Sequence, residues 1–184
     1  DGVDELVIGV DGEVWVYDGA TMLEAVNNNS IDKTYDEKPL YHKNFNLNDD
    51  GTEKDGSQCS ILKPVTRFAV GDVDGDGISD ITVLQVGVTD ETSGKGKAEL
   101  MLFRSGNVEA EPLASRIIHD DCGNSIFCDV KVGNVSAGNY NDIILFFRDY
   151  TDADGFAKYG YLWHAMYNPN ESGGIYKAGS GQVN

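Results

Sequence analysis

Four aspartates alternate with small residues in a short segment between two apolar runs. They occupy the first, third, fifth and ninth positions of this segment, as Asp72, Asp74, Asp76 and Asp80. In a tight loop this spacing lets the carboxylates converge on one cation, and the carbonyl of Ile78 supplies a further oxygen. Gly77, at the sixth position, permits the sharp turn that such a loop needs. The segment therefore predicts a site for a hard cation, for which Ca²⁺ is the preferred candidate.

Calcium is favoured over magnesium because the octahedral shell of Mg²⁺ resists a cage made only of protein ligands. Four carboxylates held this close without a cation would repel one another and raise some of their pKa values. An EF-hand is excluded because its bidentate glutamate would fall at Val83, and no helical pattern flanks the loop. The alternative is a solvated Asx-Gly turn that binds no ion.

The elements that position this loop are predicted to be strands. Apolar runs with a two-residue period are bounded by Gly, Asp and Asn, whereas helix signals are poor throughout. Asp11-Gly12 joins two such runs and is a strong signal for a two-residue hairpin. The predicted strands are 6–10, 14–17, 67–70, 81–86, 99–103, 127–132, 143–147 and 159–166.

Three segments of the chain, 4–17, 79–103 and 141–166, repeat one pattern of an acid, an apolar strand, a turn and a second strand. Repetition of this kind predicts four-stranded antiparallel blades of a β-propeller, in approximate units 1–60, 61–125 and 126–184. About three blades are too few to close a ring, so the chain is expected to be part of a larger propeller. A β-sandwich is the alternative fold. The polar insertion 27–56 is predicted to form exposed loops.

The stretch FAVGDVDGDGISDITVL, residues 68–84, resembles the calcium loop of FG-GAP repeats, also called VCBS-type repeats. These repeats occur in the propellers of integrin α-subunits and in many secreted microbial proteins. The resemblance implies that the loop bridges two strands of a blade and that calcium makes the turn rigid. It also implies one set of ligands: the side chains of Asp72, Asp74, Asp76 and Asp80 and the carbonyl of Ile78.

Two further segments match the same loop less completely. The opening residues match its fifth to ninth positions, so that Asp1, Val3 and Glu5 form at most a partial second site. In the third unit the outline is kept, but Ser136 and Gly138 replace two central acids. Calcium is therefore expected at the loop of the second unit above all.

The amino-acid composition limits the kinds of partner that the chain is expected to bind. Acidic residues outnumber basic ones by 31 to 14, which gives a formal charge of -17. A surface that binds nucleic acid needs clustered Lys and Arg, so no nucleic acid partner is expected, and binding to an anionic membrane surface is disfavoured for the same reason. The carboxylates suit a protein that meets divalent cations, and simple solubility is the alternative explanation. No apolar run reaches the length of a membrane span, and no signal segment opens the sequence, which is expected to be mature, trimmed or incomplete.

Cysteines and sequons favour a secreted or cell-surface protein. A Cys122–Cys128 disulfide is the preferred hypothesis, three reduced buried thiols are the alternative, and Cys59 would need a partner outside the chain. The candidate glycosylation sites are the three asparagines of N-x-S sequons in polar segments, Asn28, Asn134 and Asn170.

Catalytic signatures are absent from the sequence. Three histidines lie far apart, and acid pairs such as Asp49-Asp50 are expected by chance in so acidic a chain. Trp15 and Trp163 could stack on sugars, although aromatics in such strands are more often core. The leading hypothesis is a non-enzymatic, calcium-binding extracellular module for structure, adhesion or protein recognition, with a protein partner or self-assembly. The alternative is the propeller platform of a carbohydrate-binding or polysaccharide-degrading protein.

Overall fold

The computed structural model describes residues 4–28, 38–54, 64–89, 96–119, 128–136, 141–150 and 157–183. Over these residues the chain forms three antiparallel sheets and one short α-helix. The prediction of an all-β fold is confirmed, whereas the arrangement of the sheets as propeller blades stays a prediction. No helix among the described residues is long and apolar enough to cross a membrane.

Each sheet is a meander in which strands pair in the order of the sequence. The first sheet contains β1 (Leu6–Val10), β2 (Glu13–Tyr17) and β3 (Tyr41–Asn44). The second sheet contains β4 (Val65–Gly71), β5 (Asp80–Thr89), β6 (Gly96–Phe103) and β7 (Ala114–His119). The third sheet contains β8 (Cys128–Gly133), β9 (Asp142–Tyr150), β10 (Ala157–Tyr167) and β11 (Ile175–Val183). The remaining elements are α1 (Gly19–Asn27) and the 3₁₀ turns η1 (Arg104–Gly106) and η2 (Ser172–Gly174).

The hairpin between β1 and β2 turns at the predicted residues. Asp11 and Gly12 have φ values of 50° and 88°, as a two-residue turn with both central residues left-handed requires. The turn is held by the two residues that follow β3, because Asn46 Nδ2 donates to the carbonyl of Asp11 at 2.7 Å and Phe45 N donates to that of Gly12 at 2.8 Å. Local sequence therefore sets this hairpin, and a segment more than thirty residues later fixes it in place.

Two predictions about the segment after β2 are wrong. Helix signals were expected to be poor throughout, but α1 forms directly after Asp18, whose side chain caps it by accepting from Thr21 N at 2.7 Å. The insertion 27–56 was expected to form only exposed loops, but it supplies β3, which pairs with β2. Phe45, the residue directly after β3, is 1% exposed because it fills the space between two sheets.

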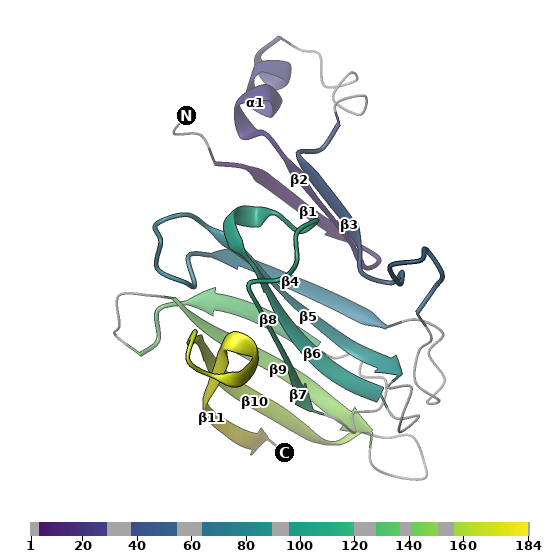
Figure 1. Ribbon diagram of the computed structural model, residues 1–184, viewed down its shortest axis with the longest axis vertical. Helices are drawn as coiled ribbons and strands as arrows, with labels where there is room; N and C mark the ends of the chain where they lie inside the picture. The colour runs from purple at the N-terminus through teal and green to yellow at the C-terminus, as the bar shows by residue number, and fades with distance from the viewer. Residues whose placement is uncertain are drawn as a thin grey trace.

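The sheets stack face on face, with the second sheet between the first and the third (Figure 1). One apolar cluster joins the first and second sheets through Val14, Val16, Phe45, Ile81, Val83, Phe103 and Val108. The other joins the second and third sheets, with Leu84, Leu100, Leu102, Val130, Ile143, Leu145, Trp163 and Ile175 among its members. Burial of these faces is what holds one meander against the next.

The contact between the second and third sheets places their loops at one edge. Strands β4 and β8 lie side by side, so closely that a Cβ atom on Gly71 would come within 2.5 Å of Val132 Cγ1. Beyond these strands, Asn141 N donates to the carbonyl of Asp72 at 3.1 Å. The loop before β5 and the loop before β9 are therefore neighbours.

Candidate metal centre

The four-aspartate loop connects β4 to β5, and the pair Gly71 and Asp80 closes the ladder beneath it. Gly77 has φ of 87°, as the sharp turn at this position requires. The carboxylate of Asp72 folds the loop over itself, because Oδ1 accepts from Gly75 N at 2.7 Å and Oδ2 accepts from Gly77 N at 3.0 Å. The loop is thus wrapped around the side chain at its own first position.

Asp80 lies at the base of the loop, and this residue is 0% exposed to solvent. Its Oδ2 accepts from Val73 N at 3.0 Å and Asp74 N at 3.2 Å, and its Oδ1 accepts from Ser105 N at 3.0 Å. Burial raises the pKa of Asp80 above its ordinary value, although these hydrogen bonds act in the opposite direction. Backbone dipoles alone therefore do not offset the cost of burying this charge, and a cation beside it would.

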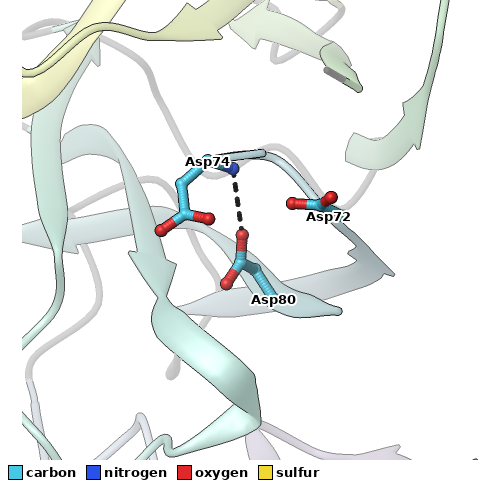
Figure 2. Close-up of side chains that lie close together, drawn as sticks. All are labelled: Asp72, Asp74 and Asp80. Atoms are coloured by element: carbon cyan, nitrogen blue, oxygen red, sulfur yellow. Dashed lines mark hydrogen bonds between the residues drawn. The ribbon is translucent and has the colours of Figure 1, made fainter. Parts of the chain in front are cut away.

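Asp72, Asp74 and Asp80 each offer a carboxylate oxygen, and these oxygens lie within 4.8 Å of one another (Figure 2). Calcium binds oxygen at about 2.3–2.6 Å, so two ligands of one ion lie up to about 5 Å apart. The spacing and the all-oxygen donor set both fit this ion. Three of the predicted side-chain ligands are therefore brought together.

Asp76 lies outside this cluster of three. Its Oδ1 accepts from Ile78 N at 2.9 Å, and its Oδ2 is 3.7 Å from Arg104 Nε. Its role as a ligand and that of the Ile78 carbonyl remain predictions.

Arg104 is a charged member of the site that sequence reasoning missed. It opens η1 directly after β6, and its Nη2 and Nε lie 2.5 and 2.6 Å from Asp74 Oδ2. The Asp74 side chain is 1% exposed while that of Arg104 is 53% exposed. Nothing in the local sequence indicated this pair, because strand pairing between β5 and β6 brings the two residues together.

The loop before β9 repeats part of this geometry without the central acids. Asp142 Oδ2 accepts from Val135 N at 2.8 Å and Ser136 N at 2.7 Å, the same two positions that bond Asp80 in the second sheet. Its Oδ1 accepts from Ser136 Oγ at 3.0 Å and lies 3.1 Å from His164 Nε2. A histidine and a hydroxyl thus face the carboxylate of the third sheet.

Asp142 gives a pH-dependent contribution to stability. Burial raises its pKa, but the contact with His164 and the hydrogen bonds from Val135 and Ser136 outweigh burial and bring the pKa to about 2, against 3.8 for an unperturbed aspartate. Because the folded pKa is the lower one, this stabilisation is present above pH 4 and is lost as the pH falls through 2. Between pH 4 and pH 2 we expect the free energy of unfolding, measured with urea, to fall by about 1 kcal/mol more for the wild type than for Asp142→Asn.

Asp80 changes the stability in the opposite direction: because its pKa is raised in the folded state, its effect on stability becomes more favourable as the pH falls. The comparison of the wild type with Asp142→Asn removes that contribution because both proteins keep Asp80. Parallel pH profiles for the two proteins would contradict the assignment to Asp142.

The other predicted site residues are scattered. Glu5 is exposed and lines a pocket of about 340 Å³ together with Ile78 and Ser105, whereas Asp1 and Val3 lie outside the described residues, so the partial second site stays a prediction. The three sequon asparagines lie at exposed positions, as glycan attachment requires: Asn28 at the end of α1, Asn134 after β8 and Asn170 after β10.

Cys128 is buried on β8, and as a thiol it has its pKa raised to about 11 by desolvation. A thiol with so high a pKa is a poor nucleophile near neutral pH. Cys59 and Cys122 lie outside the described residues. The pairing of Cys122 with Cys128 therefore stays a prediction.

Comparison with known proteins gives no relative: no protein family, no curated protein and no solved structure matches the chain. The case for function therefore rests on the sequence pattern and on the geometry of the site.

Proposed function

We propose that the chain is a calcium-stabilised β-propeller segment of FG-GAP or VCBS type, which acts as an extracellular structural, adhesion or protein-recognition module and not as an enzyme. The observation that carries the proposal is the convergence of Asp72, Asp74 and Asp80 within 4.8 Å, in the loop whose spacing resembles that family. The fully buried Asp80 supports it, because this carboxylate lacks full compensation without a cation.

Calcium acts in this proposal by making the edge of the second sheet rigid. The ion would join Asp72 and Asp74, at the start of the loop, to Asp80, at the start of β5. Because Asp80 also accepts from Ser105 N, the same ion would tie the loop to the turn that follows β6. Sites in extracellular modules bind calcium with a Kd of about 0.1–1 mM, which matches the concentration outside cells.

The proposal assigns structural roles to two histidines that could otherwise act in catalysis. His42 Nε2 lies 2.9 Å from Glu13 Oε2, and its ring stacks on Trp15 with centroids 5.0 Å apart. His164 lies against Asp142. In this proposal these contacts hold the histidine side chains in place and take no part in catalysis.

Calcium titration by calorimetry, with thermal unfolding, tests the proposal. We expect the wild-type chain to bind one calcium ion at the four-aspartate loop and Asp74→Ala/Asp76→Ala to bind it at least tenfold more weakly. At ten times Kd the ion stabilises the folded state by about 1.4 kcal/mol, which corresponds to a rise of about 3–6 °C in Tm. The double variant should show no such rise.

Asp49→Ala/Asp50→Ala is the matched control, because it removes two adjacent acids from another loop. Asp50 there accepts from Thr52 and lies in a turn, so this variant should keep calcium binding. Absence of calcium uptake by the wild type, or equal uptake by Asp74→Ala/Asp76→Ala, would show that the loop is an acidic turn without a metal.

A further inference from the structure

Arg104 lies against the four-aspartate loop through pairing that the fold imposes. Phe103 pairs with Ile81 at the end of the ladder between β5 and β6. Arg104, which follows Phe103, therefore lies beside the end of the loop that leads into Ile81. From there the guanidinium reaches Asp74, and the following residue, Ser105, donates its N–H to Asp80 at 3.0 Å. Two consecutive residues of η1 thus bond two of the three clustered carboxylates.

The guanidinium of Arg104 and a calcium ion would both interact with the carboxylate of Asp74. Both Nη2 and Nε of Arg104 lie within 2.6 Å of Asp74 Oδ2, and Asp76 Oδ2 is 3.7 Å from Nε. A divalent ion placed among the three carboxylates would experience repulsion from a positive group a few ångströms away. The arginine also gives the buried Asp74 side chain a counter-charge when no metal is present.

We propose that Arg104 is the internal counter-cation of this loop: it holds the calcium-free loop in its binding geometry and lowers calcium affinity by competing with the ion for Asp74. This inference rests on the proposed calcium site and concerns how that site is regulated. By linkage, the competition is reciprocal, so calcium weakens the contact between Arg104 and Asp74 as much as that contact weakens calcium binding.

The residue equivalent to Arg104 can be identified in each of the three sheets, and the comparison links this arginine to the four-aspartate loop. In the third sheet Ile143 pairs with Ala165, so Met166 stands where Arg104 stands in the second sheet. The loop of that sheet lacks the central acids. In the first sheet Leu6 pairs with Tyr17, which puts Asp18 at the same place. Among these three positions the cation accompanies the loop that has the full set of aspartates.

The test is a calcium titration of the wild type and Arg104→Gln by calorimetry, together with thermal unfolding in chelator and in saturating calcium. We expect Arg104→Gln to bind calcium about five- to tenfold more tightly. In chelator its Tm should fall by about 2–4 °C, because Asp74 loses its counter-charge, and in saturating calcium this difference should disappear. Arg104→Lys keeps the charge but loses the planar fork, so its affinity should lie between the two.

Arg67→Gln is the matched control, since it removes the same charge from an exposed position on β4, where Arg67 Nη1 donates to the carbonyl of Thr66 at 2.9 Å. Its calcium affinity should equal that of the wild type within twofold. Equal or weaker binding by Arg104→Gln in a wild type that does bind calcium overturns the role of Arg104 alone. If none of these proteins binds calcium, the proposed metal site is wrong and this inference falls with it.

Discussion

Replacing Asp80 with alanine is expected to destabilise the fold by about 2 kcal/mol in calcium-free buffer. The carboxylate accepts hydrogen bonds from three backbone N–H groups, those of Val73, Asp74 and Ser105. Its removal leaves these donors without an acceptor. Val73 is buried, where an unsatisfied donor costs about 1–3 kcal/mol, whereas water can replace part of the lost bonding at the more exposed Asp74 and Ser105. The relief from removing a buried charge offsets part of this loss, since burial raises the pKa of Asp80 despite the three hydrogen bonds. Urea unfolding in chelator measures the difference.

Asp72→Ala is the control that separates stability from metal binding. Asp72 accepts from Gly75 N and Gly77 N, which lie at exposed positions where water can replace the carboxylate, so the variant should lose about 1 kcal/mol or less in chelator. Both variants should lose calcium binding, since both remove a clustered oxygen. If Asp80→Ala were as stable as Asp72→Ala, the hydrogen bonds to Asp80 would not hold the loop to η1.

Phe45→Ala is expected to cost about 3–5 kcal/mol, the usual range for a buried phenylalanine. Phe45 is 1% exposed and packs edge to face on Phe103, with ring centroids 5.6 Å apart. Its side chain joins the first sheet to the second, so its loss leaves a cavity between two sheets and not within one. The hydrogen bond from Gln85 Nε2 to the Phe45 carbonyl, at 2.6 Å, involves the backbone and is kept. Urea unfolding again gives the measurement.

Tyr176→Ala serves as the matched aromatic control. Tyr176 is 41% exposed on β11, so its truncation should change the unfolding free energy by less than about 1 kcal/mol. A cost for Phe45→Ala as small as that of Tyr176→Ala would mean that the first sheet does not depend on this contact.

Local sequence was sufficient for most strands and for the shape of the loop. Alternating apolar residues predicted β1, β2, β5 and β6 at or within a few residues of their observed bounds. Asp11-Gly12 predicted the first hairpin and Gly77 the sharp turn of the loop, because positive φ is a property of the residue itself. The helix α1 was also readable in principle, since Asp18 precedes Ala, Met and Leu, but nine residues carry little periodic signal.

Strand β3 could not be predicted in the same way. Tyr41–Asn44 has a polar sequence, and it becomes a strand because β2 offers an unpaired edge and Phe45 fills the adjacent core. Such a segment takes its structure from its neighbours and not from its own propensity.

The sequence by itself determined an all-β chain with one loop of alternating aspartates, because periodicity and spacing are local properties. The tertiary structure decided which charges meet. Within the loop, where the spacing had predicted that four carboxylates converge, it placed Asp76 outside the cluster of Asp72, Asp74 and Asp80. It also set Arg104 against Asp74, and His164 against Asp142. These partners are far apart along the chain and become neighbours through strand pairing, so no local pattern could have indicated them.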